Sequence, residues 1–342
     1  MSISLKNNGE EFNILVVKYR ALGDSVMGLS TISYLRSIYP NSKIYYGIRN
    51  WTTKLYDEVE TDADGIISLS FESLRDFYES YKKIKELNIH HIHELHQSGR
   101  SKKFFNLYQI FNKVKYTFHN HHLKSGGDVL GQGEIKPLIQ RDLDGAYSFL
   151  GKGTKGPDYL DFPPIIKHTF SKKDVVTLGV VATRETKMWD LENYLLLAKL
   201  IKKDFPSFEI TVPLSRSKDD LDIKDKLLKI DREGICNIVH EDLSKIPKLI
   251  AQSKLYVGND TGLKHIAIAC DVKSYTLFGP EPPNEWHPYD KESHPYFFID
   301  PLECRYREAH YCGLSTCESM VCLKDITVED VYKKIKIDLE KV

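Results

Sequence analysis

The stretch that decides the fold is Leu255–Tyr289, LYVGNDTGLKHIAIACDVKSYTLFGPEPPNEWHPY. The apolar run Leu255–Val257 predicts a buried strand, and Thr261–Ala269 predicts the helix that follows it. A helix that begins directly after a strand offers unpaired backbone N–H groups and the positive end of its dipole, which suits an anion and particularly a diphosphate. The stretch therefore predicts an α/β layer with an anion site at a strand end.

The turn between this strand and helix supplies the candidate ligand contacts. They are the turn residues, the first helical turn and a histidine on the same helix: Gly258, Asp260, Thr261, Gly262, Leu263 and His265. Glycines on both sides of the Asp260-Thr261 pair allow a ligand to approach the backbone closely. His265 follows Thr261 by four residues, so the two share a helix face. A packed helix residue without a ligand is an equally good interpretation of His265.

The same alternation of short apolar strands and helices runs through the rest of the chain. Further strands are predicted at Asn13–Tyr19, Lys43–Ile48, Gly65–Ser70, Ile89–Glu94, Val175–Val181, Phe208–Val212, Asn237–His240 and Ser274–Phe278. Further helices are predicted at Ser25–Ile38, Leu191–Asp204, Ser244–Ala251 and Val328–Leu339. Near-continuous apolar strands that alternate with helices are typical of parallel α/β layers.

The pattern restarts after a stretch rich in glycine and proline, Gly151–Lys173, which is typical of an interdomain linker. We therefore expect two Rossmann-like domains in tandem with a cleft between them. The expected limits are residues 1–165 for an N-terminal, acceptor-side domain and 166–325 for a nucleotide-sugar donor domain, followed by a C-terminal helix at 326–342.

An aspartate follows the first predicted strand, in the segment ILVVKYRALGDSV. The turn Arg20–Asp24 leads from the strand into a helix, and ligands of open α/β sheets bind outside the carboxyl ends of the strands. The sequence thus places Asp24 at the edge of the sheet where ligands bind. The competing interpretation is a helix N-cap, with Gly23 serving the turn. The segment lacks the G-x-G-x-x-G fingerprint, so a dinucleotide-dependent dehydrogenase is a remote alternative.

A second polar loop follows the strand Val175–Val181, in GVVATRETKMWDLENY, Gly179–Tyr194. Hydroxyl groups and two cations at a strand end suit a phosphate, which makes Thr183, Arg184, Thr186 and Lys187 candidate phosphate contacts. The competing interpretation is a solvated loop whose Trp189 anchors the next helix to the core.

These segments, in this order, resemble glycosyltransferase family nine, the ADP-heptose:lipopolysaccharide heptosyltransferases. The resemblance rests on Ala21-Leu22-Gly23-Asp24, on the loop from Thr183 to Trp189, and on Asp260-Thr261-Gly262-Leu263-Lys264-His265 followed by Phe278-Gly279-Pro280. It spans roughly residues 13 to 330. It implies a GT-B fold and an inverting transfer of a heptose or related sugar from a nucleotide diphosphate, with ADP-heptose as the expected donor, to a lipopolysaccharide core.

The resemblance also implies roles for single residues. Asp24 would be the general base, and Lys187 with Thr183 would hold the donor diphosphate. Asp260 would bind hydroxyls of the donor sugar, while the turn after it would offer backbone donors and His265 would lie near the phosphates or support the loop. The loop Leu214–Asp220, where the family has an acidic ribose contact, gives no clean match. A protein acceptor and a non-catalytic sugar-nucleotide binder of the same fold stay open as alternatives.

A basic segment lies in the first half of the chain. From Tyr81 to Lys124 there are nine Lys or Arg residues, two acids and seven histidines. We interpret it as a face for an anionic glycolipid acceptor, with a solvated surface as the alternative. Within it His96, Ser98 and Arg100 follow a predicted strand, and together with Gly23 they are the candidate acceptor-side residues.

Four of the six cysteines lie close together in the sequence. Cys304, Cys312, Cys317 and Cys322 form C-x7-C-x4-C-x4-C, and four thiolates could hold a structural zinc or iron. The spacing is not that of a standard zinc finger, so reduced thiols are the alternative. Catalysis itself requires no cofactor in this interpretation, because a lysine and a helix N-terminus can stabilise a leaving diphosphate.

The overall composition limits the classes of partner. The chain has 342 residues, with 48 Lys plus Arg balanced by 48 Asp plus Glu, which argues against a dedicated nucleic-acid binder. No apolar run approaches the roughly 20 residues that a membrane-spanning helix needs, and the N-terminus lacks a signal-peptide pattern. We therefore expect a cytoplasmic protein that meets the inner face of the bacterial inner membrane only through its acceptor.

Overall fold

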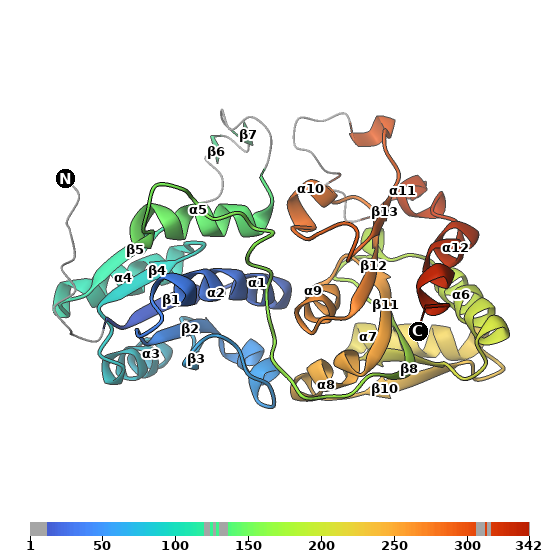
Figure 1. Cartoon of the computed structure of the whole chain (residues 1–342), viewed down its shortest axis with the longest axis horizontal. Coiled ribbons are helices and arrows are strands. Elements are labelled where there is room, and N and C mark those ends of the chain that lie inside the picture. The colour runs from blue at the N-terminus through green and yellow to red at the C-terminus, as the bar shows by residue number, and fades with distance from the viewer. Residues whose placement is uncertain are drawn as a thin grey trace.

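A computed structural model of the chain describes residues 12–119, 124–125, 128–129, 136–305, 312 and 316–341. Two open sheets with helices on their faces lie side by side, the N-terminal half on the left of Figure 1 and the C-terminal half on the right. In the described part of the chain, no helix combines the length and apolar character needed to cross a bilayer.

The first sheet has the strand order β3-β2-β1-β4-β5, and every neighbouring pair is parallel. Its strands are β1 (Ile14–Lys18), β2 (Ile44–Arg49), β3 (Gly65–Leu69), β4 (His91–Glu94) and β5 (Lys115–Phe118). One face is covered by α1 (Leu22–Met27), α2 (Leu29–Ile38) and α5 (Leu138–Leu150), and the other by α3 (Leu74–Glu86) and α4 (Gly99–Phe111). A short 3-10 helix, η1 (Asn50–Tyr56), follows β2, and β6 (Lys124–Ser125) pairs with β7 (Asp128–Val129).

The second sheet has the order β10-β9-β8-β11-β12-β13, again with parallel neighbours. Its strands are β8 (Lys173–Gly179), β9 (Glu209–Leu214), β10 (Cys236–His240), β11 (Ser253–Asn259), β12 (Lys273–Phe278) and β13 (Tyr296–Phe298). The α-helices of this half are α6 (Leu191–Asp204), α7 (Lys218–Ile230), α8 (Ile246–Ala251), α9 (Gly262–Ala269), α10 (Pro283–Trp286), α11 (Val321–Lys324) and α12 (Val328–Leu339). Its 3-10 helices are η2 (Glu185–Lys187), η3 (Leu243–Lys245) and η4 (Glu303–Arg305).

The expected architecture of two parallel α/β layers is confirmed, and each predicted strand is present with its ends shifted by at most a few residues. The sequence analysis missed β5 and β13, which lie at the edges of the two sheets. The domain limits proposed from the sequence stay predictions. The C-terminal helix α12 packs against α6, and its apolar residues Val331, Ile335 and Leu339 belong to the core of the second half.

The helix predicted at Ser25–Ile38 is instead two helices, α1 and α2, separated at Gly28. A Cβ atom on Gly28 would lie 2.1 Å from the hydroxyl oxygen of Tyr46, which donates a hydrogen bond to the carbonyl of Ser25. The glycine is therefore required by this close contact between α1 and β2. Because α1 begins at Leu22, Asp24 lies in its first turn, and the predictions of a turn through Asp24 and of an Asp24 N-cap are wrong.

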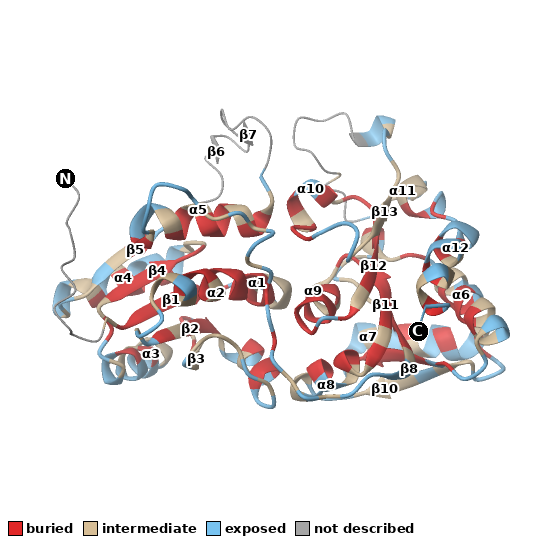
Figure 2. Ribbon diagram, in the orientation of Figure 1, coloured by how far each residue is buried: buried red, intermediate tan, exposed pale blue. Residues whose placement is uncertain are grey.

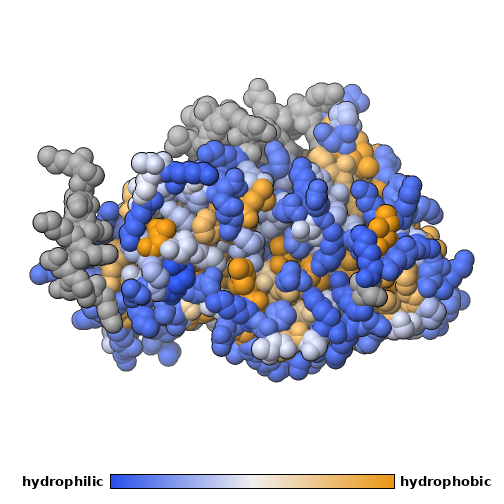
Figure 3. Space-filling view, in the orientation of Figure 1, coloured by the Kyte–Doolittle hydropathy of each residue, from blue (hydrophilic) through white to orange (hydrophobic). Residues whose placement is uncertain are grey.

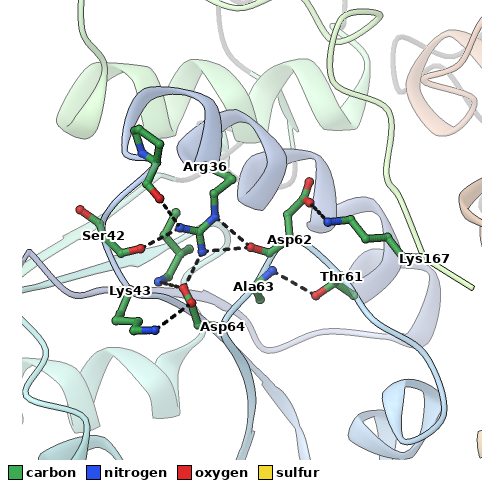
Figure 4. A network of polar contacts seen from close by, with 10 residues as sticks. Arg36, Ser42, Lys43, Thr61, Asp62, Ala63, Asp64 and Lys167 are labelled. Carbon is green, nitrogen blue, oxygen red and sulfur yellow. Dashed lines mark hydrogen bonds and ion pairs between the residues drawn. The ribbon is translucent and has the colours of Figure 1, made fainter.

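The segment between the two halves contacts both. The backbone N–H of Ile166 donates to Ala269 in α9, whereas Lys167 forms a bridge with Glu60 and an ion pair with Asp62 at 2.6 Å. Figure 4 shows Lys167 beside a network in which Arg36 of α2 donates to backbone carbonyls and to Asp64. These contacts fix the course of the linker along the first half.

One apolar cluster joins the two halves. Buried residues of α1 and α2, such as Val26, contact buried residues of α9, such as Ile266, in a single cluster, and Figure 2 shows the buried faces of α1 and α9 turned toward each other. Two ion pairs add to this contact: Arg141 with Glu285 at 2.7 Å, both buried, and Lys245 with Glu58. The side chains of this cluster are buried, while the surface seen in Figure 3 is mostly hydrophilic with apolar patches among the polar residues.

Candidate active site

The candidate site lies where α1 of the first half meets α9 of the second. A Cβ atom on Gly23 would lie 2.8 Å from the ring of His265, and one on Gly262 would lie 3.2 Å from the side chain of Leu22. The two motifs that the sequence analysis singled out, about 240 residues apart in sequence, are thus in van der Waals contact. They bring the carboxyl end of β1 next to the carboxyl end of β11.

Asn259, which the sequence analysis did not select, connects the two polar loops of the second half. It is buried at the end of β11, and its side-chain oxygen accepts hydrogen bonds from the backbone N–H of Trp189 and the hydroxyl of Tyr194, both at 3.0 Å. Its side-chain amide donates to the carbonyl of Val180 at 2.9 Å. Asn259 therefore fixes the course of the loop that carries Lys187.

Asp260 lies between two lysines. Lys187 contacts one carboxylate oxygen at 2.7 Å, and Lys264 contacts the other at 2.5 Å. Lys187 keeps 15% of its side chain exposed, whereas Lys264 has none exposed. The Lys264 ammonium also donates to the carbonyl of Trp286 at 2.8 Å and lies 4.3 Å from the centre of the Phe278 ring. Lys264 is thus enclosed, and Lys187 faces the open side of the site.

The charges of this trio are set by burial and by each other. Burial by itself would raise the pKa of Asp260, but the ammonium groups of Lys264 and Lys187 outweigh burial and hold that pKa well below its usual range. Burial lowers the pKa of Lys264 to about 8, although Asp260 opposes that change. At neutral pH the carboxylate is therefore ionised between two cations, with one net positive charge available to an anionic ligand.

The N-terminus of α9 is open in the way that an anion site requires. Its cap residue Thr261 makes no side-chain capping hydrogen bond, and its buried hydroxyl has no hydrogen-bond partner among the residues that the structure describes. Gly262 and Leu263, which follow it, are half-buried. The first N–H groups of the helix point out of its end, as at any helix start.

His265 packs at the junction of the two halves. Its Nδ1 atom is hydrogen-bonded to the Tyr289 hydroxyl, and its ring lies against Gly23. Burial, followed by the charge of Lys264, holds the pKa of His265 well below its usual value, so the ring is neutral at physiological pH. The structure thus favours the interpretation of His265 as a packed residue that supports the turn.

Asp24 is half-buried at the edge of an open pocket of about 720 Å³. Burial raises the pKa of its carboxyl group above the usual value, while the nearby cations Lys18 and Arg20 oppose that rise. Lys18 is itself fully buried in an ion pair with Asp142 of α5 at 2.8 Å. Asp24 therefore has the raised pKa and partial access that suit a group accepting a proton.

The pocket beside Asp24 carries an excess of positive charge. It brings together Ser98 and Arg100 from the predicted acceptor side with residues that the sequence analysis did not select. The full lining is Tyr19, Arg20, Ala21, Asp24, Arg49, Trp51, Glu72, Ser98, Gly99, Arg100 and Lys103. Four cations face two acids there, Arg100 is paired with Glu72, and the guanidinium of Arg49 lies 4.8 Å from the centre of the Tyr19 ring. Cations and an exposed Trp51 next to a carboxylate suit a charged sugar.

Several predicted contacts lie elsewhere. His96 is half-buried outside the lining of this pocket, and Gly23 lies against His265 rather than in the pocket. Gly258 is buried within β11, where a Cβ atom would lie 2.5 Å from the hydroxyl of Tyr256, so the contact that the structure shows for it is packing. Thr183 is exposed in its loop.

The four C-terminal cysteines do not form a ligand set in the structure. Within the described ranges, which include all four, no three His, Cys, Asp or Glu side chains come together in a way that could hold a metal ion. Cys304 is exposed, the backbone N–H of Cys312 donates to Pro280, and the Cys317 sulfur accepts from the N–H of Met320 at 3.4 Å. The residues as placed do not fit a four-thiolate metal site, and no step of the chemistry is derived from one.

Comparison with known proteins agrees with this geometry. Residues 156–304 match the family model of glycosyltransferase family 9 (heptosyltransferase). A segment of 117 residues is 29% identical to lipopolysaccharide heptosyltransferase 1 from Campylobacter coli and spans 33% of this chain and 34% of that protein, or about a third of each.

Solved structures extend the similarity of the fold over nearly the whole chain. Escherichia coli ADP-heptose lps heptosyltransferase II superimposes with a TM-score of 0.73 at 17% identity, over 96% of this chain and 99% of that one. Escherichia coli heptosyltransferase WaaC with ADP gives a TM-score of 0.69 at 14% identity, over 96% and 100% of the two chains. The two parallel sheets therefore form a GT-B fold, and residues 156–304, which carry Lys187 and Asp260, are similar to glycosyltransferase family 9.

Proposed function

We propose that this protein is an inverting glycosyltransferase that moves a heptose or a related sugar from a nucleotide diphosphate, ADP-heptose, to an anionic lipopolysaccharide core. The observation that carries the proposal is the contact between α1, whose first turn holds Asp24, and the start of α9, which follows Asp260 and its partner Lys187. The similarity to heptosyltransferases over residues 156–304 supports the class of donor.

In the proposed reaction, a hydroxyl group of the acceptor attacks the anomeric carbon of the donor sugar. The bond between that carbon and the diphosphate oxygen breaks, the nucleoside diphosphate leaves, and the hydroxyl proton passes to Asp24. A hydroxyl group is a poor nucleophile at neutral pH, so a carboxylate that accepts its proton accelerates the step. A single displacement of this kind inverts the configuration at the anomeric carbon.

The charge that grows on the leaving diphosphate needs fixed positive partners. Lys187 supplies one, because its ammonium group lies at the open side of Asp260. The N-terminus of α9 supplies another through its first N–H groups and its dipole. Lys264 stays with Asp260, so that Asp260 remains neutralised when Lys187 turns to the diphosphate. In this proposal Lys264 is a positioning residue.

The donor half of the proposal predicts selective stabilisation by a nucleotide diphosphate. We expect ADP to raise the melting temperature more than UDP or GDP at equal concentration, since a ligand at 100 times its Kd stabilises the folded state by about 2.7 kcal/mol. Thermal-shift titrations of the full chain measure this. Replacing Lys187 by Met should remove most of the shift. Equal shifts with the three nucleotides would contradict an adenine-specific donor site.

The proposed acceptor pocket predicts that substitutions in it change the KM for the acceptor. Replacing Arg100 and Lys103 by Gln is expected to raise the KM for a delipidated, water-soluble acceptor by at least about tenfold, because the loss of even one charge-assisted hydrogen bond costs about 1.5–3 kcal/mol. The KM for the donor should stay the same. Lys102→Gln is the matched control, because Lys102 is exposed on the same helix but does not line the pocket. An unchanged KM for the acceptor in the double variant would show that this pocket does not bind the acceptor.

A further inference from the structure

The outer face of α4 is unusually apolar for a surface helix. Leu107, Ile110 and Phe111 are 53%, 72% and 71% exposed, and their spacing of three and four residues places them on neighbouring positions of the helix surface. The inner side of the same helix already buries Phe104, Phe105 and Tyr108 in the core. A helix that only packs against a sheet usually has polar residues on its solvent-facing side. The exposed apolar residues of α4 therefore indicate a second binding partner.

The neighbouring helix α3 extends this surface. The rings of Phe77 and Phe104 lie 5.4 Å apart and those of Tyr81 and Tyr108 lie 5.3 Å apart, which shows that α3 and α4 pack side by side. Leu74 and Tyr78, 90% and 65% exposed, precede Phe77 and Tyr81 by three residues and lie on the same side of α3. We call the exposed residues Leu74, Tyr78, Leu107, Ile110 and Phe111 the α3–α4 face.

Basic residues are frequent in α4 and in the residues that follow it. Residues 99–118 contain five basic residues and no acid: Arg100, Lys102, Lys103, Lys113 and Lys115. The helix α3 carries four basic and three acidic residues, so it adds no net negative charge. Apolar side chains that project from a helix together with a local excess of Lys and Arg are the features by which a helix binds the surface of an anionic bilayer.

We propose that the α3–α4 face docks directly on an anionic lipid bilayer. A second copy of the chain fits the same face less well, because a symmetric contact would bring together two surfaces on which basic residues outnumber acidic ones. The proposal goes beyond the proposed function, and it departs from the expectation that the membrane is met only through the acceptor. Binding to the bilayer needs neither donor nor acceptor.

The face is continuous with the pocket beside Asp24. Arg100 and Lys103, in the first turns of α4, line that pocket, whereas Ile110 and Phe111 lie at the other end of the helix. The two helices lie on the left of Figure 1, away from the second half, and they cover the sheet face opposite α1 and α2. A protein docked through α3 and α4 would therefore keep its donor half in solution and hold the pocket at the bilayer surface.

Sedimentation with lipid vesicles tests the proposal. The full chain is expected to bind vesicles of phosphatidylcholine that contain phosphatidylglycerol, to bind pure phosphatidylcholine weakly, and to be released by salt. The variant L107S/I110S/F111S should lose about tenfold or more of its partition to the anionic vesicles, since each buried apolar side chain adds to binding. Because the three side chains are exposed, the folded state and its response to ADP should be unchanged.

The matched control removes three exposed apolar side chains from the second half. Leu196, Leu228 and Ile337 are 43%, 53% and 53% exposed on α6, α7 and α12, and L196S/L228S/I337S should bind vesicles like the unmodified chain. Three results would overturn the proposal. They are no binding of the unmodified chain to anionic vesicles, an equal loss of vesicle binding in both triple variants, or light scattering that shows a dimer of the unmodified chain and a monomer of L107S/I110S/F111S. If the chain does not bind vesicles but is still stabilised by ADP, the membrane proposal is wrong and the proposed function is unaffected.

Discussion

Replacing Asp24 by Asn is expected to lower kcat by about 10²–10⁴-fold, the range that general base catalysis contributes. The amide keeps the size and the hydrogen-bonding oxygen of the carboxylate but does not accept a proton at neutral pH. Asp24 is half-buried, so the isosteric change leaves the packing of α1 in place. The melting-temperature shift with ADP should survive, because the proposed donor contacts all belong to the second half.

The pH profile of the reaction adds an independent measurement for Asp24. Burial raises the pKa of this carboxyl group, with Lys18 and Arg20 opposing the rise. A base works only when deprotonated, so kcat should increase with pH through the raised pKa and level off above it. That rise should disappear in Asp24→Asn.

Glu329→Gln is the control for Asp24→Asn. Glu329 is an exposed acid in the first turn of α12, as Asp24 is an acid in the first turn of α1, so its replacement removes the same favourable charge from a helix start. We expect no change in kcat from the control. Full activity in Asp24→Asn would remove Asp24 from the role of base.

Replacing Lys264 by Met is expected to destabilise the fold by about 3 kcal/mol, the lower end of the range for breaking a buried ion pair. Lys264 is fully buried and contacts Asp260, the Trp286 carbonyl and the face of the Phe278 ring. Without it, the buried carboxylate of Asp260 keeps only Lys187. Urea unfolding, followed by circular dichroism, measures the loss.

Lys187→Met provides the contrast. Lys187 is partly exposed, so its removal should cost less stability than the removal of Lys264 and should instead abolish most of the donor-induced shift. The double variant Asp260→Asn/Lys264→Met should recover part of the lost stability, because no uncompensated charge remains buried. Equal destabilisation by Lys264→Met and Lys187→Met would contradict the division of roles between the two lysines.

The sequence predicted the strands well because most of them are apolar on both faces, which a parallel sheet requires. It missed β5, whose sequence KYTF has one buried residue, and β13, which is three residues long at a sheet edge. β5 has few apolar side chains and β13 is short, so a search for apolar runs of strand length does not detect them, although it detected the other two edge strands, β3 and β10. The need for glycine at position 28, between α1 and α2, comes from Tyr46, a residue of another element, and no local pattern contains that contact.

The candidate site could likewise be predicted only in part from local sequence patterns. Asp24, Asp260 and Lys187 follow strand ends, so their places could be predicted from the alternation of strands and helices. In the sequence, nothing distinguishes Lys264 from any other lysine of a predicted helix. Its structural role depends on Asp260, Trp286 and Phe278, which enclose it. The pair Arg141–Glu285 joins residues 144 positions apart, and the pocket cations Arg20, Arg49 and Lys103 come from separate segments. Contacts between distant elements are set by the packing of the two halves, which local patterns do not specify.

The most direct test of the account is a transfer assay with ADP-heptose and a purified anionic core acceptor, with the anomeric configuration of the product determined by nuclear magnetic resonance. The account predicts a new glycosidic bond with inverted configuration, formed by the unmodified chain and reduced by about 10²–10⁴-fold in Asp24→Asn. A product with retained configuration, or release of ADP that does not depend on acceptor or on Asp24, would contradict it.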